Sequence, residues 1–167
     1  MSCRHCDMIA AGKARVYEDD SVYAFHSPKP AAAGHIVLVP KKHVTILEEL
    51  PDKLTGHMFT VANKLSTVLF EILGAHGTNI IVENGAGQHV PHVAMNIIAR
   101  KENDGLGLEW APLQMSEDDL KTAELLLKDN SKSVGIFEKE KPKPIEEKKA
   151  EEIQEENYLT RQLKRIP

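Results

Sequence analysis

Neither a long apolar run nor a surplus of positive charge occurs in this sequence of 167 residues. Its apolar stretches fall short of the roughly 20 residues that a membrane-spanning helix needs. The N-terminal stretch MSCRHCDMIAAGK lacks the apolar core of a signal peptide. A net charge of −4 provides no global basic field that would attract nucleic acid. We therefore expect a cytoplasmic protein with no membrane partner.

Cysteine is also scarce, because the chain has only Cys3 and Cys6. In a reducing compartment, two cysteines spaced so closely are more typical of a metal site or a redox pair than of a structural disulfide. The remaining composition, with 41% hydrophobic and 28% charged residues, is that of an ordinary globular domain with its own core.

Alternation of β-branched and aromatic residues predicts five strands, and a 3.6-residue period predicts two helices. The expected strands are 15–20, 21–27, 35–40, 78–84 and 92–100, and the expected helices are 52–73 and 117–133. The longer helix carries one apolar stripe, composed of Leu54, Met58, Val61, Leu65, Val68 and Ile72. This order of elements predicts an α+β fold, a five-stranded antiparallel sheet with about two helices.

The composition changes near residue 138, where Lys, Glu and Pro become dominant. We expect a domain over 1–137, a charged linker over 138–156 and a short amphipathic segment over 157–167. The last segment either docks its apolar side chains on the domain or a second copy, or contacts RNA or a protein partner.

Two cysteines and two histidines form a candidate metal set. Cys3 and Cys6 have CxxC spacing, His43 follows the third strand, and His92 opens the fifth. Two thiolates and two imidazoles suit tetrahedral zinc. The separations are far too long for a zinc finger, so spacing alone favours a loose thiol pair and two surface histidines, unless the fold brings the four together.

Three longer stretches resemble the histidine triad (HIT) family, in its Hint-like branch. They are CRHCDMIAAGKARVYEDDSVYAFHSPKPAAAGHIVLVPKKHV, GTNIIVENGAGQ and VPHVAMNIIARKENDG, which span roughly residues 3–110. The resemblance implies a HIT-like fold, a homodimer and chemistry on nucleotides. It also implies structural zinc held by Cys3, Cys6, His43 and His92, as in zinc-bearing bacterial relatives.

The catalytic positions depart from the family motif His-x-His-x-His. The family's nucleophilic middle histidine is replaced by Ala94, and the third histidine by Asn96. A methyl group has no lone pair with which to attack phosphorus. By analogy with nucleophile deletions in hydrolases, the rate loss is on the order of 10⁶. No residue is therefore assigned as catalytic with certainty, although His35, Asn96 and His89 are candidates.

The resemblance also suggests where a nucleotide would bind. The candidate residues are His26, Ser27, Asn84, Gln88, His89 and Asn96. Ser27 stands where many relatives have a ribose-binding aspartate, and it offers one hydroxyl in place of a carboxylate. The other histidines, His5, His57 and His76, are expected to face solvent, as is His26.

Two functions follow from these observations. The first is a zinc-stabilised nucleotide-binding protein that has lost the covalent step. The second is a nucleotide phosphoramidase or hydrolase with rearranged catalytic residues, in which His35 or His89 takes part.

Overall fold

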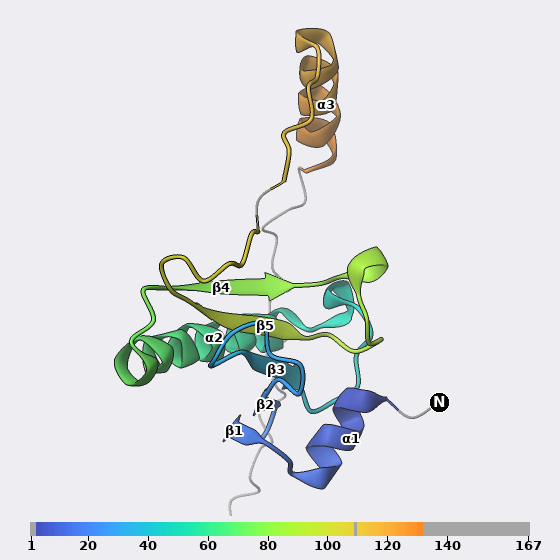
Figure 1. The fold of residues 1–167 in the computed structure, drawn as a ribbon. Coiled ribbons are helices and arrows are strands. Elements are labelled where there is room, and N and C mark those ends of the chain that lie inside the picture. Colours follow the sequence, from blue (N-terminus) through green and yellow to red (C-terminus); the bar gives the residue numbers. More distant parts are fainter. Residues whose placement is uncertain (1–2, 109, 132–167) are drawn as a thin grey trace, which may run out of the picture. The chain divides into compact units, whose positions relative to one another are not determined.

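The computed structural model describes residues 3–108 and 110–131 (Figure 1). It divides into two compact units, Met1–Glu117 and Asp118–Pro167, which are described separately below. The predicted linker 138–156 and amphipathic segment 157–167 lie outside the described residues and stay predictions. No helix in the described part of the chain is long and apolar enough to cross a membrane.

The first unit is built on the predicted five-stranded antiparallel sheet, with strand order β1-β2-β3-β5-β4 (Figure 1). Its strands are β1 (Arg15–Glu18), β2 (Val22–His26), β3 (Ile36–Pro40), β4 (Gly77–Val82) and β5 (Met95–Arg100). Short 3-10 turns, η1 (Leu47–Glu49) and η2 (Gly85–Gly87), follow β3 and β4. The α+β class and the number of strands are thus confirmed.

Helix α2 (Asp52–Leu73) has the predicted bounds. It ends at Gly74, which adopts the left-handed conformation with φ of 57° that a residue without Cβ takes most easily. Its predicted apolar stripe is only partly correct, because Val68 and Ile72 are 45% and 74% exposed.

The buried face of α2 is instead rotated around the helix axis. Besides the predicted Met58, Val61 and Leu65, it includes Ala62, Ser66 and Leu69. At 3.6 residues per turn, the last three lie on one side of the predicted stripe. The small side chains of Ala62 and Ser66 let the helix approach the sheet. The rotation of the buried face leaves Val68 exposed.

Helix α1 (Arg4–Ala11) is absent from the elements that the sequence predicts. It has eight residues and contains no fully buried side chain. A helix this short is marginal in isolation and needs tertiary contacts. Met8 and Ile9 provide them by packing against the sheet.

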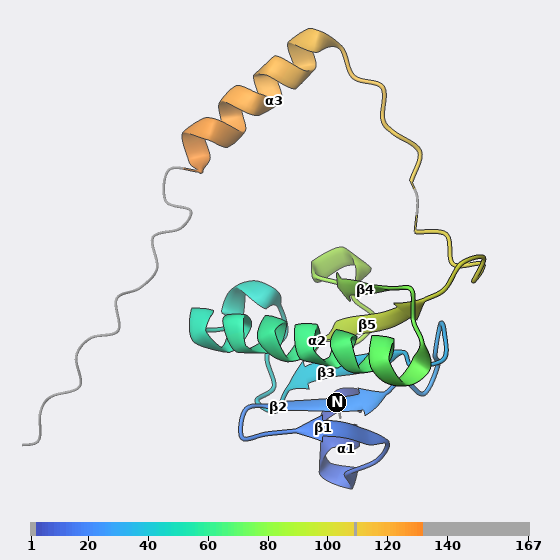
Figure 2. The same cartoon turned by 90° about the vertical axis from the view of Figure 1, so that its left-hand side faces the viewer.

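The two helices cover opposite faces of the sheet (Figure 2). Because side chains alternate along a strand, Leu38 and Ile97 pack in the larger core with α2, whereas Phe25 and Val37 pack with α1. Ala94 joins the α1 side, so the candidate site forms on this face.

Strand β5 begins at Met95, three residues later than predicted. The backbone N–H of His92 bonds the carbonyl of Val90 at 2.7 Å, and that of Val93 bonds Val44 at 2.8 Å. These loop partners replace the regular ladder, so His92 and Ala94 precede the strand.

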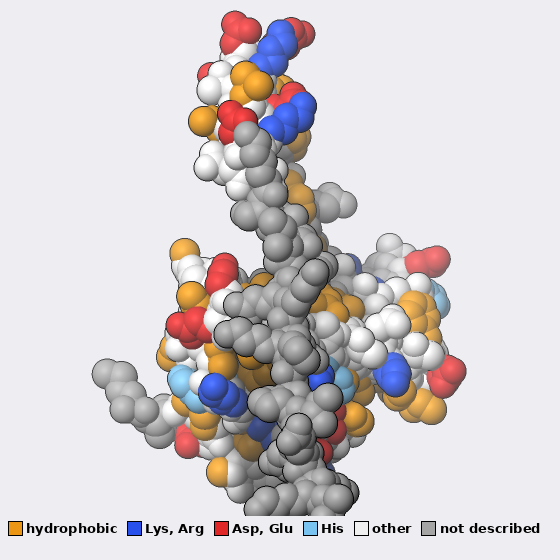
Figure 3. Space-filling model, turned by 180° about the vertical axis from the view of Figure 1, so that it is seen from behind, with side chains coloured by type: hydrophobic (Ala, Val, Ile, Leu, Met, Phe, Trp, Pro, Cys, Tyr) orange, Lys and Arg blue, Asp and Glu red, His pale blue; other side chains and the backbone are white. Residues whose placement is uncertain are grey.

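Helix α3, Glu117–Asn130, lies in the second unit apart from its first residue, and it ends before the predicted residue 133. None of its side chains is buried within the described residues. Apolar side chains lie among charged ones on its surface (Figure 3), and the exposed leucines are Leu120, Leu125, Leu126 and Leu127.

Candidate metal centre and adjoining cavity

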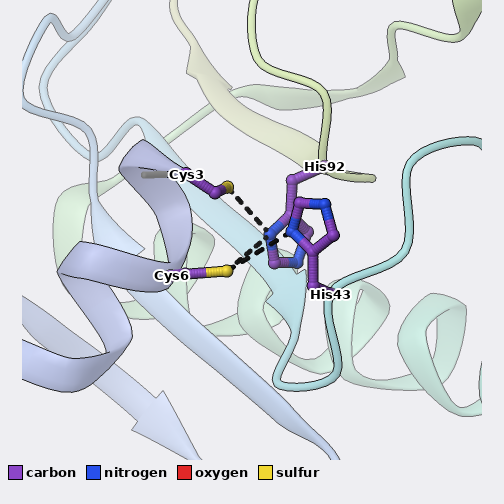
Figure 4. Close-up of side chains that lie close together, drawn as sticks. All are labelled: Cys3, Cys6, His43 and His92. Atoms are coloured by element: carbon purple, nitrogen blue, oxygen red, sulfur yellow. Dashed lines mark hydrogen bonds between the residues drawn. The ribbon is translucent and has the colours of Figure 1, made fainter. Parts of the chain in front are cut away.

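Three segments bring the predicted metal set together (Figure 4). Cys3 is the residue that precedes α1, and Cys6 lies in the first turn of that helix. His43 follows β3, and His92 lies just before β5. The four candidate ligand atoms lie within 4.8 Å of one another, although 37 and 86 positions separate Cys6 from the two histidines in sequence.

The spacing of these atoms fits one tetrahedral ion. Cys3 Sγ and His92 Nδ1 are 3.4 Å apart, Cys6 Sγ and His43 Nδ1 are 3.4 Å apart, and Cys6 Sγ and His92 Nδ1 are 3.5 Å apart. Zinc–sulfur and zinc–nitrogen bonds of about 2.3 and 2.0 Å at the tetrahedral angle predict a sulfur–nitrogen edge of about 3.5 Å. The four side chains therefore have the donor types that zinc prefers, and the three sulfur–nitrogen distances match the edge of its tetrahedron.

His92 is prepared for ligation by its other ring nitrogen. Its Nε2–H donates to the Pro40 carbonyl at 2.9 Å, which leaves a lone pair on Nδ1, the atom that faces the sulfurs. Such a partner fixes the tautomer and orientation of a metal-binding histidine. Burial lowers the pKa of this imidazole, and the Pro40 carbonyl opposes that change in part. A neutral imidazole is the form that binds a metal ion.

The thiols complete the donor set, with a different protonation requirement. Partial burial raises the pKa of the Cys6 thiol, and the neighbouring Cys3 sulfur raises it further. Two thiols so close together resist becoming two thiolates unless a cation lies between them. A metal ion bound by both sulfurs supplies that positive charge.

His5 does not face solvent as predicted, and this expectation was wrong. Its ring centroid lies 5.6 Å from that of His92 and 5.9 Å from that of Phe25. Its Nδ1 is buried without a hydrogen-bond partner, and burial lowers its pKa to about 4. The helical geometry of α1 explains the difference, because it turns position 5 toward the sheet. No local pattern in the sequence indicates this placement unless α1 is predicted first.

Three more histidines were expected to face solvent, namely His26, His57 and His76. His26 and His76 are exposed, as predicted. His57 is half-buried, and its Nε2 lies 2.7 Å from a carboxylate oxygen of Asp19. His57 thus ties α2 to the turn between β1 and β2 and takes no part in the candidate site.

A cavity of about 150 Å³ adjoins the metal centre on the α1 face of the sheet. Its lining includes Arg4, His5 and Met8 from α1, Phe25 and Val37 from the sheet, His92, Ala94 and Asn96, and Ser27, Lys29, Gln88 and His89 from loops. Although β5 begins late, His92, Ala94 and Asn96 do share one side, as the period of two predicts. The cavity has apolar walls at Ala94 and a mixed polar rim.

Four of the six predicted nucleotide contacts line this cavity: Ser27, Gln88, His89 and Asn96. The other two, His26 and Asn84, are not among its lining residues. Asn84 accepts a hydrogen bond from the Leu47 N–H at 2.9 Å and donates to the Glu48 carboxylate at 2.8 Å. Its carboxamide therefore holds the start of η1.

His35, a predicted catalytic candidate, is buried behind Asn96 and does not line the cavity. Both of its ring nitrogens have partners, the Ala31 amide at 3.1 Å and Asn96 Oδ1 at 3.0 Å. Of the residues proposed to replace the nucleophile, only His89 lines the cavity. Sequence reasoning missed Arg4, Met8 and Lys29, whose placement depends on α1 and on the loop after β2.

Comparison with known proteins agrees with this fold. The HIT domain model matches residues 10–103. An uncharacterized HIT-like protein of Methanocaldococcus jannaschii is 44% identical over 92 residues, which cover 54% of this chain and 70% of that protein. The chain therefore belongs to the HIT family, as its motifs predict.

Two further relatives are a tetraphosphatase and a zinc-bound protein. A bis(5′-nucleosyl)-tetraphosphatase of Schizosaccharomyces pombe is 37% identical over 120 residues, covering 67% of this chain and 63% of that protein. The solved structure of a zinc-bound histidine triad family protein from Mycobacterium smegmatis shares 27% identity at a TM-score of 0.61. That alignment covers 78% of this chain and 98% of the other.

Proposed function

We propose that this protein binds a nucleoside phosphate on a zinc-stabilised HIT domain and does not perform covalent nucleotidyl transfer. The observation that carries the proposal is the contrast at one cavity edge, where His92 belongs to a complete Cys₂His₂ donor set while Ala94 presents a methyl group. The metal function and the catalytic function of the family motif are thereby separated.

Zinc bound by Cys3, Cys6, His43 and His92 has a structural role in this proposal. Four protein ligands fill the tetrahedral shell and leave no position for a catalytic water. The ion joins the start of α1 to the loops after β3 and before β5. It supplies folding energy that a short helix such as α1 lacks by itself.

The cavity supports binding of part of a nucleotide. Its volume of about 150 Å³ is below the roughly 300–1,000 Å³ of pockets that enclose a whole small ligand. Arg4 and Lys29 at its rim supply positive charge, whereas Glu83 opposes them. We therefore place the phosphate inside the cavity and the base at its open edge.

The test measures metal content, binding and turnover on one preparation. Elemental analysis is expected to give about one zinc per chain. Isothermal titration is expected to detect AMP, and a fluorogenic adenosine phosphoramidate is expected to show no turnover above buffer. Absence of binding by AMP, ADP, GMP and diadenosine polyphosphates would refute the nucleotide part, and a metal-free folded protein would refute the zinc part.

The second candidate is a hydrolase or phosphoramidase with rearranged residues. It is favoured by one observation, the exposed imidazole of His89 on the cavity rim. In this case turnover is present in the wild type and disappears in His89→Gln. An unchanged rate in that variant removes His89 as the nucleophile. Replacement of His35 alone is expected to act indirectly, because His35 lies behind Asn96.

The remaining expectations concern assembly and location. We propose a homodimer, supported by β4 as the last strand of the sheet and by the exposed Ile80 on it, 38% accessible. Light scattering on the full chain tests this state. A partner for residues 157–167 and a cytoplasmic location also stay proposals.

A further inference from the structure

The loop between β2 and β3 folds back onto the histidine that ends it. The Ser27 N–H donates to the His35 carbonyl at 2.8 Å, and the His35 N–H donates to the Ala32 carbonyl at 3.1 Å. The backbone N–H of Ala31 donates to His35 Nδ1 at 3.1 Å. The loop therefore holds the imidazole ring through one specific nitrogen.

This contact determines the tautomer of His35. An amide N–H can only donate, so Nδ1 must accept with its lone pair. A neutral imidazole then carries its single proton on Nε2. That nitrogen lies 3.0 Å from Asn96 Oδ1. His35 is 8% exposed, so water does not readily replace either partner.

The tautomer in turn determines the orientation of the Asn96 carboxamide. An Nε2–H donor requires the amide oxygen, so the oxygen of Asn96 faces His35 and its NH₂ group is directed away. The oxygen and nitrogen of an amide are distinguished by such networks. Asn96 lines the cavity beside Ala94, whereas His35 does not.

We infer that His35 is a positioning residue, which fixes the Asn96 carboxamide so that its NH₂ group donates to an acceptor oxygen of the ligand. The identity of that ligand as a nucleoside phosphate rests on the proposed function. The donor is uncharged and lies next to the Ala94 methyl group. Asn96 therefore recognises phosphoryl oxygen by hydrogen bonding, and His35 contributes without contacting the ligand.

The two hydrogen bonds of His35, one to the Ala31 N–H and one to Asn96 Oδ1, require an acceptor and a donor at position 35. A glutamine side chain offers both an acceptor oxygen and a donor nitrogen, so it can reproduce the two contacts. A leucine fills similar space but offers neither. An aspartate at position 96 keeps the acceptor for His35 but turns a negative oxygen toward the phosphate.

The first experiment reads the tautomer without any ligand. Long-range ¹H–¹⁵N spectra of the zinc-loaded full chain, at alkaline pH where imidazoles are neutral, are expected to show His35 protonated at Nε2 only. Protonation at Nδ1 would overturn the inference, whether or not the protein binds nucleotides.

The second experiment measures AMP affinity in matched variants. We expect His35→Gln to stay within about threefold of the wild type, His35→Leu to bind about tenfold more weakly, and Asn96→Asp about 100-fold more weakly. Asn63→Asp, which adds the same charge at an exposed position of α2, is expected to leave the affinity unchanged. Adenosine, which has no phosphate, is expected to be insensitive to all four changes.

The outcomes separate the inference from the proposed function. Equal losses in His35→Gln and His35→Leu would overturn the positioning role. Parallel losses for adenosine and AMP would mean that Asn96 only maintains the fold. A wild type that binds neither compound would refute the proposed function, and the tautomer would still decide whether His35 orients Asn96.

Discussion

Residues 92–96 contribute both to the candidate metal centre, through His92, and to the adjoining cavity, through Ala94 and Asn96. The candidate metal centre has all four ligand side chains, whereas the cavity lacks the family's nucleophile. At the candidate metal centre, His92 has a fixed tautomer, a buried ring, and two sulfurs at 3.4 and 3.5 Å from its Nδ1. Two residues on, Ala94 presents only a methyl group, and Asn96 is held by His35. Under the proposed function, this difference separates the structural use of the family motif from its catalytic use, because His92, Ala94 and Asn96 each contact a different set of neighbours.

The largest effect is expected from restoring an imidazole at the cavity floor. Ala94→His supplies the missing lone pair beside the candidate phosphate site. If the rest of the cavity still positions a nucleotide, turnover of adenosine phosphoramidate is expected to rise at least about 100-fold, part of the roughly 10⁶ that nucleophile loss costs. Ala94→Gln adds bulk without a nucleophilic nitrogen and is the control. A silent Ala94→His variant that still binds AMP would show that more than the nucleophile is missing.

The next largest effect is expected at the metal centre. With free zinc at about a thousand times its dissociation constant, Cys6→Ser is expected to remove about 4 kcal/mol of zinc-dependent stability. Denaturant unfolding with and without zinc measures this change. His26→Ala, an exposed histidine outside the metal set, is expected to keep the zinc dependence. If the wild type is equally stable with and without zinc, the metal has no structural role, and the proposed difference between the metal centre and the cavity is wrong.

A smaller effect is expected at the proposed ribose side of the cavity. Ser27→Asp introduces a carboxylate that accepts from both ribose hydroxyls, so AMP affinity is expected to increase about tenfold. Binding of 2′,3′-dideoxy-AMP is expected to stay unchanged, since it lacks both hydroxyls. An equal gain for the two ligands would place the ribose elsewhere.

The smallest effect is expected at Asn84, which sequence reasoning assigned to the nucleotide. Because its carboxamide is used by Leu47 and Glu48, Asn84→Ala is expected to lower the unfolding free energy by about 1 kcal/mol. The affinity for AMP is expected to stay the same. Calorimetry on one preparation measures both, and a loss of affinity without a loss of stability would restore Asn84 to the binding site.

The sequence predicted the framework well because the period of hydrophobic residues is a local property. Five strands and the bounds of α2 follow from it. The buried face of α2 does not, since the exposure of Val68 depends on how closely Ala62 and Ser66 allow the helix to approach the sheet. Helix α1 was missed for a related reason: its stability comes from contacts that no eight-residue pattern reveals.

The candidate site divides in the same way. The four candidate metal ligands were predicted from their residue types and the family resemblance, and the structure brings them together. His5 and Arg4 could not be placed from the sequence, because their positions depend on the unpredicted α1. Asn84 and His35 lie outside the cavity lining, contrary to their predicted roles. Sequence alone does not reveal that the polar atoms of Asn84 bond Leu47 and Glu48, or that His35 bonds Asn96.

Helix α1 takes part in both the candidate metal centre and the cavity wall, so a bound metal would help to hold that wall in place. The helix carries or adjoins the two sulfurs of the proposed zinc site, and it contributes the side chains of Arg4, His5 and Met8 to the cavity wall. Without an ion, α1 stays on the sheet through the packing of Met8 and Ile9 and the ring contacts of His5 with Phe25 and His92. Amide protons of α1 are therefore expected to exchange with solvent first when a chelator removes the metal, through local opening that leaves the sheet intact. Metal occupancy would then control how stably α1 closes one wall of the cavity.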